Sequence, residues 1–498
     1  MAKKVLVIGA GIAGLAAASY LRRNGFETEI FESNKVPGGL CASWQRNGFT
    51  FDGCIHWLMG SGPSSNLHVP WVELGAGDLT YVEWSVYAVV RLKGGDAFTI
   101  YTDPDALEAE MLRLSPEDGN IAHVIAQAIR AVKRIDMPAA YDALGGGEKL
   151  ALLAALPRSL LTLGPWMKKP VAALFEKMKG EKLREAFRAL FGDAMEGFPA
   201  VALFMMLGFM AKKSAGYPIG GSTAFARAIE KKYLDLGGVI RYGSRVDEIL
   251  VEGGSAVGIK GAWGETHGDW VIAAGDAHDL MTRLLGGRYA QPDLEKAFGT
   301  YKRFPSLIFV SLGLGADYSS QPHSLSFPLE EPLALEGGAL VRDRLSVRFQ
   351  TFDPTSAPTG KTAATVMIET YNDEFWTKLR DAGGTAYAEE KRKVGKEVTR
   401  ALNRAIPGLS AAVETVDVAT PCTFIRYTGN WHGSFEGWLP TLETMGKPLG
   451  RTIPGVANLR LVGQWVNPGG GLPPCAMDGR SLAKELCKLE GIKFRAEA

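Results

Sequence analysis

The sequence lacks several patterns on which whole classes of protein depend. Its five cysteines are odd in number and widely separated, with no CxxC pair, which argues against a disulfide framework and against a thiolate metal site. The seven histidines are scattered without an HExxH motif, so we expect no metal. No apolar run is long enough to span a bilayer, and the apolar residues after the first lysines form a predicted strand, so we expect no signal peptide. Together these absences fit a reducing compartment, and we expect a cytoplasmic protein.

Strong charge and the common nucleophile motifs are also lacking. The net charge is +1 and no basic stripe is present, which argues against nucleic acid as a partner. The chain contains no P-loop, no nucleophile elbow and no evident pair of nucleophile and base. We therefore expect a bound cofactor to carry the chemistry, while the protein orients the cofactor and substrate, excludes water and sets the local electrostatics.

A glycine motif near the N-terminus is the most informative segment that is present. It lies between a Val/Leu/Ile strand and an Ala/Leu-rich helix, where Gly9 permits a tight turn and Gly11 lets the backbone approach a pyrophosphate. Gly14 allows close packing of helix on strand, and the helix N-terminus supplies free N–H groups. Glu32 ends the second strand, where an acid binds a ribose hydroxyl. The motif predicts a Rossmann-like dinucleotide-binding domain.

A second glycine pair, Gly38-Gly39, follows this acid and favours FAD over NAD. More backbone can then approach the cofactor, which the longer FAD needs and NAD does not usually need. A second dinucleotide fingerprint is missing, because the nearest candidate, at Gly313 and Gly315, has Tyr318 in place of the third glycine. Electrons must then come from the substrate or from an external donor or acceptor that visits the same flavin.

Here the chain resembles the FAD-dependent amine-oxidase-like superfamily, within it the branch of phytoene desaturases, carotenoid isomerases and retinol saturases. The resemblance rests on these motifs, on Phe51-Asp52-Gly53 followed by His56, and on a C-terminal block of residues 459–480 that leads into a helix. It implies that this block lies against the flavin ring, where a helix N-terminus stabilises negative charge near flavin N1. Motif and resemblance together assign the FAD contacts to Gly9, Gly11, Ile12, Ala13, Gly14, Glu32, Ser33, Gly38, Gly39, Leu40, Ile55, His56, Val246, Ala274, Gly275, Gly463, Gln464, Gly471, Leu472 and Met477.

The chain is too long for one simple core, so we expect two interleaved domains of α/β class. The FAD-binding domain is predicted to combine residues 1–75, 215–290 and 420–490. Residues 76–214 and 291–419 should then form the substrate domain. The first of these inserts is predicted to be mainly helical, and the second an antiparallel sheet crossed by a helix over residues 386–406.

Two apolar stretches of the first insert point to a lipophilic substrate. Residues 150–163, followed by Trp166 and clustered lysines, fit either a segment in a membrane interface or a buried helix with a solvated basic loop. Residues 197–211 carry no charge and are rich in Met and Phe, which suits an adaptable cavity wall or a plain core helix. In the second insert, Tyr371, Phe375 and Trp376 are candidates for the cavity wall or for core and surface positions.

The resemblance implies desaturation or saturation of a carbon–carbon bond in a long polyene or isoprenoid-like substrate, with hydride exchanged at flavin N5. His56 is expected beside the flavin, for polar positioning or proton transfer, or else as a structural histidine beside Asp52. Glu436 is a second candidate for proton transfer. Leu40 and Cys41 after the glycine pair look more like the isomerase and saturase members than the desaturases.

Three other functions stay open at this point. The first is a redox-neutral cis/trans isomerase of a polyene that uses reduced FAD. The second is a flavin amine oxidase, which would need an aromatic cage around the substrate nitrogen. The third is a flavin-bound scaffold or lipid carrier, in which no electron donor or substrate would change the flavin. The expected partners are a lipophilic small molecule, an external electron acceptor or donor, and a membrane surface at its periphery.

Overall fold

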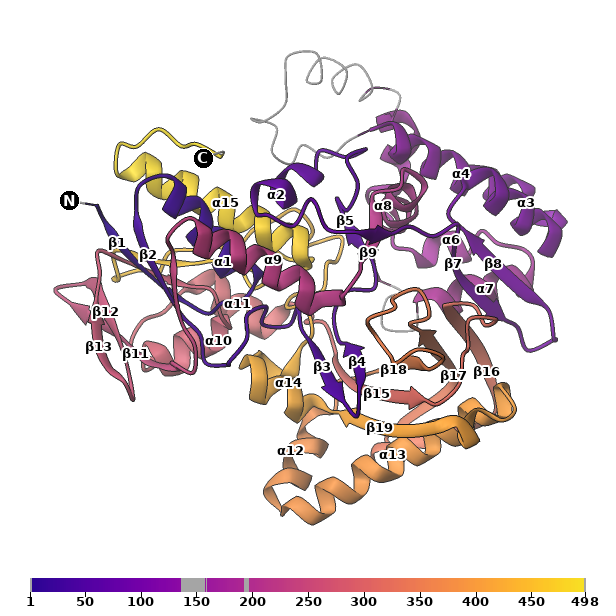
Figure 1. Cartoon of the computed structure of the whole chain (residues 1–498). Coiled ribbons are helices and arrows are strands. Elements are labelled where there is room, and N and C mark those ends of the chain that lie inside the picture. The colour runs from indigo at the N-terminus through magenta and orange to yellow at the C-terminus, as the bar shows by residue number, and fades with distance from the viewer. Residues whose placement is uncertain (1, 136–156, 158, 192–196, 497–498) are drawn as a thin grey trace.

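The structure is a computed structural model, which describes residues 2–135, 157, 159–191 and 197–496. Its ribbon has two parts that lie side by side, one around a five-stranded sheet and one around a seven-stranded sheet (Figure 1). Both ends of the chain belong to the first part. The mixed α/β class predicted from the sequence is confirmed.

The five-stranded sheet is parallel throughout and brings together strands from distant parts of the sequence. Its order is β10-β2-β1-β14-β20. The strands are β1 (Lys4–Ile8), β2 (Glu27–Phe31), β10 (Val239–Arg241), β14 (Trp270–Ala273) and β20 (Leu459–Leu461). Each of the three pieces predicted for the FAD-binding domain supplies at least one strand. The domain boundaries themselves stay a prediction.

Three helices gather beside this sheet, α1 (Ile12–Arg23), α9 (Gly221–Asp235) and α15 (Leu472–Leu489) (Figure 1). The contact between α1 and α15 is especially close, because a Cβ atom added at Gly479 would lie 2.7 Å from the Ala17 nitrogen. A small antiparallel sheet of β11 (Val246–Glu252), β12 (Ser255–Gly261) and β13 (Gly264–His267) lies at the opposite side from these helices. The chain then returns to the parallel sheet as β14 and continues into α10 (Ala277–Asp279), a π-helical turn over residues 280–284, and α11 (Pro292–Thr300).

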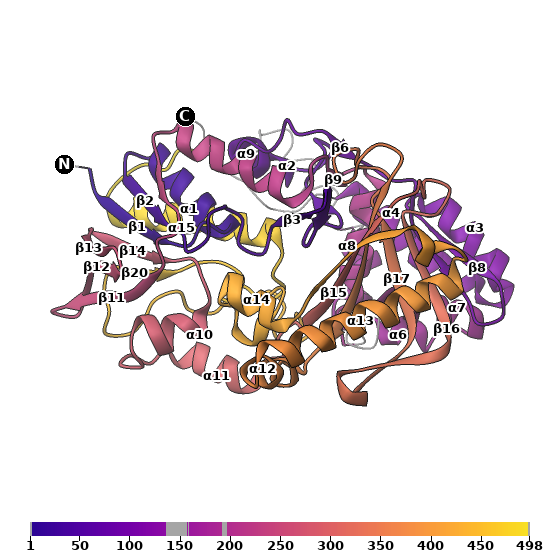
Figure 2. The same cartoon turned by 60° about the horizontal axis from the view of Figure 1, so that its bottom comes forward.

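The seven-stranded sheet has the order β19-β15-β18-β17-β16-β7-β8. Its strands are β7 (Val86–Arg91), β8 (Ala97–Tyr101), β15 (Ser306–Leu314), β16 (Ser324–Leu335), β17 (Leu340–Phe349), β18 (Thr362–Thr370) and β19 (Val413–Ala419). The strands predicted in the second insert are therefore present, and α13 (Gly384–Ala405) crosses the sheet as expected (Figure 2). Two shorter helices, α12 (Asp373–Asp381) and α14 (Pro421–Thr428), lie at the end of α13.

The prediction of a mainly helical first insert misses β7 and β8. This pair extends the seven-stranded sheet, and β7 joins β16 in parallel through Leu325 and Ser326. The burial of β7 alternates at Ala88 and Val90, the period of a half-buried strand. The remainder of the insert is helical, with α2 (His68–Glu73), α3 (Pro104–Leu114), α4 (Gly119–Arg134), α6 (Ala172–Phe175), α7 (Glu181–Phe191) and α8 (Ala200–Ala211).

Short strands connect the two parts. A hairpin of β3 (Ser43–Arg46) and β4 (Phe49–Asp52) is followed by β5 (Leu58–Met59), which pairs with β9 (Ala215–Pro218). On its other side β9 pairs with β6 (Tyr81–Val82). These short strands thus lie where the chain leaves the part with the parallel sheet for the helical insert and where it returns.

The stretch 150–163 lies largely outside the described residues. Of its described residues, Leu160 and Leu161 are 52% and 81% exposed, whereas Trp166, which follows the stretch, is buried in the core of the helical insert. Tyr371 is half exposed and Trp376 is fully buried, so both take the core and surface positions that the sequence left open. Within the part of the chain that the structure describes, no helix has the length and apolar character needed to cross a membrane.

Candidate functional site

A cavity of about 1290 Å³ lies between the carboxyl ends of the parallel strands and the second part of the molecule. Its wall includes the glycine turn after β1, the end of β14, the first turn of α15, and residues of α8, β15 and β18. The crevice beyond the carboxyl ends of parallel strands is where open α/β sheets bind ligands. The cavity is therefore the candidate functional site.

The glycine turn makes a cradle of bare backbone. Gly9 has φ of 102°, which only glycine adopts readily, and a Cβ atom at Gly14 would lie 2.1 Å from the Gly9 carbonyl oxygen. Gly11 differs, because its added Cβ would meet only the Gly38 oxygen, at 4.0 Å, and would otherwise project into open space. The second glycine pair packs on this turn, with the Gly38 N–H donating to the Ala10 carbonyl over 2.9 Å. Such a cradle leaves room for a pyrophosphate against the N-terminus of α1.

Glu32 is buried at the edge of this cradle. One carboxylate oxygen, Oε2, accepts a hydrogen bond of 2.7 Å from the Ala10 N–H, and the other accepts from the Asn34 N–H over 2.8 Å. A carboxylate offers about four acceptor positions, so Oε2 keeps one for a ribose hydroxyl. The residue thus faces the cavity with its geometry already fixed by the backbone.

The far end of the cavity is formed by the turn before α15. Gly469, Gly470 and Gly471 all have positive φ, of 115°, 51° and 85°, so this path favours glycine. It ends at the N-terminus of α15, where Leu472 and Met477 line the cavity. The free N–H groups and positive dipole end of this helix suit a cofactor ring that becomes negatively charged.

All the residues predicted to contact FAD line this one cavity except Gly14. Gly14 instead permits the packing described above, the role that the motif assigned to it. Both candidate catalytic residues, His56 and Glu436, also line the cavity. The contacts of each residue with a cofactor stay predictions, but residues far apart in sequence reach the same site.

Asp52 organises the wall between the cofactor cradle and the hairpin. Its buried carboxylate accepts from the Ser222 N–H over 2.7 Å, from the Tyr217 hydroxyl over 3.0 Å and from the Cys54 N–H over 2.9 Å. The neighbouring Gly221 leaves space for this carboxylate, since a Cβ there would lie 2.4 Å from Oδ2. Asp52 therefore fixes the start of α9 and the segment before His56, and these bonds go to groups other than the His56 ring.

The His56 ring is held neutral. Burial, and secondly the nearby Arg348 guanidinium, lower the pKa of His56 to about 3. Nη2 of Arg348 also donates a hydrogen bond of 2.6 Å to the His56 carbonyl oxygen. At neutral pH the imidazole therefore carries no charge, which favours polar positioning over the proton transfer that its ordinary pKa suggested.

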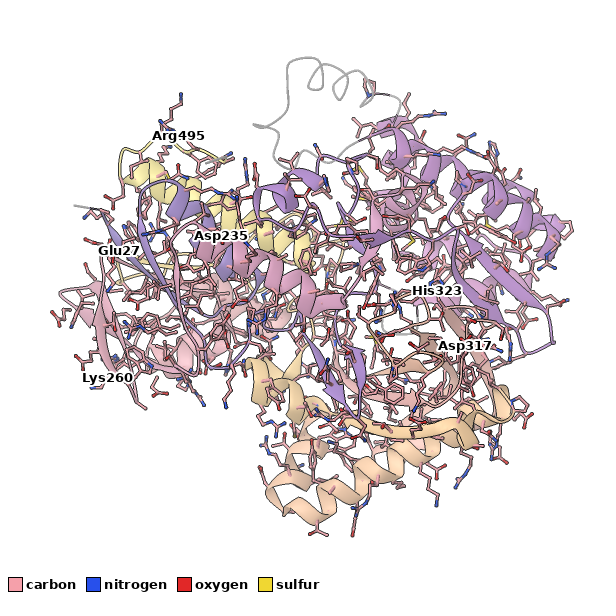
Figure 3. The ribbon with its side chains drawn as sticks, in the orientation of Figure 1. Glu27, Asp235, Lys260, Asp317, His323 and Arg495 are labelled. Atoms are coloured by element: carbon pink, nitrogen blue, oxygen red, sulfur yellow. The ribbon has the colours of Figure 1, made fainter. Side chains whose placement is uncertain are left out.

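Arg348 itself lies in an aromatic box. Its guanidinium carbon is 5.3 Å from the ring centres of Trp84 and Phe352, and 5.6 Å from that of Tyr217. His323 (labelled in Figure 3) stacks on Trp84 at 4.8 Å. Cation–π contacts of this kind stabilise a charge that burial disfavours. The rings of Trp84, Phe352 and Tyr217 thus surround a cation of the protein itself.

Glu436 is an acid without a charged partner. Its carboxyl group has no ion pair or hydrogen bond within the described part of the chain, and burial raises its pKa to about 8. It packs against the turn before α15, because a Cβ at Gly470 would lie 2.5 Å from Cγ of Glu436. At neutral pH the structure therefore presents a protonated carboxylic acid to the cavity, next to the predicted flavin-ring turn.

The rest of the cavity is an apolar arm. Helix α8 turns Ala202, Leu203, Met205 and Met206 into it, and Leu190 and Phe198 lie beside them. The opposite side of α8, including Phe204 and Leu207, is buried in the core of the helical insert. The stretch 197–211 therefore forms a cavity wall on one side of α8 and part of the core on the other, which are the two alternatives predicted for it.

Sequence reasoning missed several residues of this wall. Tyr87, Phe304, Leu307, Met367 and Glu369 also line the cavity. They come from both inserts and carry no motif, so only their place in the tertiary structure identifies them. Among the described residues, no cluster of three or more His, Cys, Asp or Glu side chains could hold a metal ion.

Comparisons with known proteins agree with this geometry. The family model of the NAD(P)-binding Rossmann-like domain matches residues 7–73. The phytoene desaturase (neurosporene-forming) of Cereibacter sphaeroides is 28% identical, with 97% of this chain and 94% of the relative covered. Prolycopene isomerase 1 of an Oncidium hybrid cultivar is 26% identical, over 99% of this chain and 85% of the relative.

Solved structures share the fold at lower identity. An oxidoreductase from Methanosarcina mazei covers 97% of this chain with a TM-score of 0.60 and 20% identity, and all of that chain is matched. The match to putrescine oxidase bound to putrescine covers 98% of this chain and 99% of the oxidase chain, with a TM-score of 0.60 and 12% identity. At these identities the structures show the fold alone.

The predicted resemblance to the desaturase and isomerase branch is thereby confirmed. Over nearly its whole length the chain is similar to phytoene desaturases and to a 4,4'-diapophytoene desaturase. The Rossmann-like cradle, the second glycine pair and the turn before α15 fit FAD as the cofactor.

Proposed function

We propose that the protein is an FAD-dependent oxidoreductase that desaturates or saturates carbon–carbon bonds of a long apolar polyene or isoprenoid-like substrate. One observation carries this proposal: the dinucleotide cradle and the apolar arm beside α8 are parts of the same cavity. A bound flavin would then share its space with an apolar chain. Methionine side chains such as Met205 and Met206 adapt to such a chain without imposing one shape on it.

The residues assigned to the cofactor divide into two groups. The turn from Gly9 to Gly11, with the N-terminus of α1, would hold the pyrophosphate, and Glu32 the ribose. Gly463, Gln464 and the N-terminus of α15 would hold the ring end. When bound, FAD supplies two-electron transfer between the substrate and an external acceptor or donor. We keep residues 1–75, 215–290 and 420–490 as the proposed FAD-binding domain.

Glu436 and His56 would have different roles. Glu436 holds a proton on its carboxyl group at neutral pH and can donate it into the cavity. His56 stays neutral and would serve as a polar positioning group. Hydrogen bonds from Arg348 to the His56 carbonyl and from the Cys54 N–H to Asp52 hold its segment in place. A protonated acid is what saturation requires, because a carbon of the double bond must gain a proton as well as a hydride.

A redox-neutral cis/trans isomerase is the second candidate function. The protonated Glu436 favours it, since an acid in a dry cavity can lend a proton to a polyene and take it back. Three chloroplastic prolycopene isomerases are among the relatives. The isomerase would leave the mass of the substrate unchanged.

Peripheral contact with a membrane is part of the proposal, because it would give an apolar substrate a route to the cavity. Leu160, Leu161 and Met167 are exposed, and Lys168 and Lys169 adjoin them. Binding to vesicles that contain anionic lipid should decrease when Leu160 and Leu161 are replaced by Ser. Unchanged vesicle binding in this variant would remove the membrane contact from the proposal.

The first experiment is an anaerobic titration of the purified flavoprotein. We expect one member of a vesicle-borne panel of carotenoids, retinoids and unsaturated lipids to bleach the visible flavin band. Simple amines serve as the control, since an amine oxidase would respond to them and yield an aldehyde. Bleaching by amines alone would overturn the proposal, whereas no bleaching by any compound would leave saturation and isomerisation, to be tested with pre-reduced enzyme.

A further inference from the structure

The end of α14 is held by a side chain from the loop after β2. The last four carbonyl groups of a helix have no partner within it, and the carbonyl of Tyr427 is one of them. Nδ2 of Asn34 donates a hydrogen bond of 2.8 Å to this carbonyl oxygen. The same nitrogen also donates to Oε1 of Glu32 over 2.9 Å. Asn34 therefore joins α14 to the acid that is predicted to bind the ribose.

A few residues later the chain is held a second time, by the segment after β14. The Trp431 N–H donates a hydrogen bond of 2.8 Å to Oδ2 of Asp276. Asp276 is buried, and its other oxygen accepts from the Asp279 N–H over 2.8 Å, so the orientation of the carboxylate is fixed. Residues 427–431 thus form a segment, which we call the strap, with one anchor at Asn34 and the other at Asp276.

The two anchors lie on opposite sides of the glycine turn. In the parallel sheet β1 lies between β2 and β14. Asn34 follows β2, Asp276 follows β14, and the turn that begins at Gly9 follows β1. Neighbouring strands are about 4.8 Å apart, so the anchors are separated by roughly 10 Å along the carboxyl edge of the sheet. A segment of five residues reaches at most about 17 Å, so the strap is long enough to cross this edge.

The strap and the glycine turn border the same cavity. Gly9 and Gly11 of the turn line it, and so do residues 427–430 of the strap. Helix α14, from which the strap begins, lies between the two parts of the molecule in both views (Figures 1 and 2). The diphosphate proposed for the turn would therefore lie between the turn and the strap.

We propose that the strap is a further part of the cofactor-binding site, which crosses the diphosphate of FAD and must open before FAD enters or leaves. Both anchors join groups of the protein itself, so neither needs a cofactor atom. A closed strap slows entry as well as release, whereas a side chain that only contacts FAD slows release alone. The inference rests on the proposed placement of the diphosphate at the glycine turn.

The rates of FAD entry and release test the strap. Stopped-flow mixing of the apoprotein with FAD measures association through the change in flavin fluorescence, and exchange of the holoprotein against radiolabelled FAD measures release. Asn34→Ala removes the first anchor and Asp276→Ala the second. Because each variant loses one hydrogen bond that opening must break, we expect each to raise both rates by about 2- to 10-fold.

Ser33→Ala is the matched control. Ser33 Oγ donates over 3.2 Å to Oε1 of Glu32, the oxygen to which Asn34 Nδ2 also donates. The control therefore disturbs the ribose acid as Asn34→Ala does, but it leaves both anchors in place. We expect Ser33→Ala to change release alone and to keep the association rate of the unmodified protein.

Unchanged association in Asn34→Ala would overturn the inference, while the FAD site itself would stand. Equally fast association in Ser33→Ala would overturn it too, because the effect would then come from Glu32. If Asp276→Ala fails to fold, Asn34→Ala decides the question, since Asn34 is a half-buried loop residue. An unmodified protein that binds no FAD would instead overturn the proposed function, and the strap with it.

Discussion

Nη2 of Arg348 donates a hydrogen bond of 2.6 Å to the carbonyl oxygen of His56. The bond ties the seven-stranded sheet, through β17, to the segment that carries the candidate histidine. The guanidinium charge also opposes protonation of the imidazole. Replacing Arg348 by Met should raise the pKa of His56 above about 3, although burial, the larger cause, will keep it below its ordinary value. An NMR titration of the His56 ring, assigned with His56→Gln, measures this shift. An unchanged pKa would show that burial alone holds the ring neutral.

The low pKa of His56 makes stability depend on pH in a defined direction. The folded pKa lies below the unfolded value, so the unfolded chain binds more protons, and stability is lost as pH falls from roughly 6.5 toward 3. The expected loss is at most about 1.4 kcal/mol per pH unit for this residue. Urea unfolding at several pH values should show a shallower acid slope for His56→Gln. The same acid slope in both proteins would contradict the assignment.

Glu436 should act in the opposite direction. Its folded pKa of about 8 exceeds the unfolded value, so its contribution to stability is present below roughly pH 4.5 and is lost as pH rises toward 8. Glu436→Gln keeps the shape without a titratable proton and should therefore flatten the stability profile over this range. If the carboxyl group donates a proton, activity should fall by about 10²-fold or more in this variant, with the alkaline limb near pH 8 removed. Full activity at all pH values would exclude the proposed proton donor.

The glycines of the cofactor turn provide a matched pair of variants. A Cβ at Gly14 would overlap the Gly9 carbonyl oxygen, so Gly14→Ala should destabilise the fold by about 2 kcal/mol or more. Gly11→Ala has space in the protein and should fold normally, but its methyl group projects into the cradle. Flavin content after purification should therefore fall for Gly11→Ala at unchanged unfolding free energy. Full flavin occupancy in this variant would place the pyrophosphate elsewhere.

Asp52 should matter for stability as well as for cofactor binding. Asp52→Asn keeps one acceptor oxygen and replaces the other by an NH2 group, which then faces the N–H donor of either Ser222 or Cys54, and we expect a loss of about 2–4 kcal/mol. The exposed Asp235 (Figure 3), which pairs with Lys231, gives the control, since Asp235→Asn should change stability by less than about 0.5 kcal/mol. Urea denaturation compares the two. Equal effects would mean that the Asp52 network is dispensable.

The local motifs predicted much of this site because their chemistry is local. A strand, a glycine turn and a helix N-terminus need only adjacent residues, so Gly9, Gly11 and Glu32 were found where the structure places them. The long strands of the second insert also carry their own apolar pattern. These parts of the fold follow from periodicity and turn chemistry.

Features that depend on distant partners were not found from sequence. The β7–β8 pair gains its place in the sheet from β16, more than two hundred residues away, and a short strand has little signal of its own. The low pKa of His56 depends on its burial and secondly on Arg348, and the role of Asp52 depends on Ser222 and Tyr217. Only the folded chain brings these groups together.

The mass of the product tests the central claim most directly. A polyene that binds the enzyme is incubated anaerobically with the oxidised or the pre-reduced protein, extracted and analysed by mass spectrometry. The account predicts a product with two hydrogen atoms fewer in the first case or two more in the second. An unchanged mass with altered double-bond geometry would support the isomerase instead. An unchanged polyene, together with oxidation of an amine, would contradict the account.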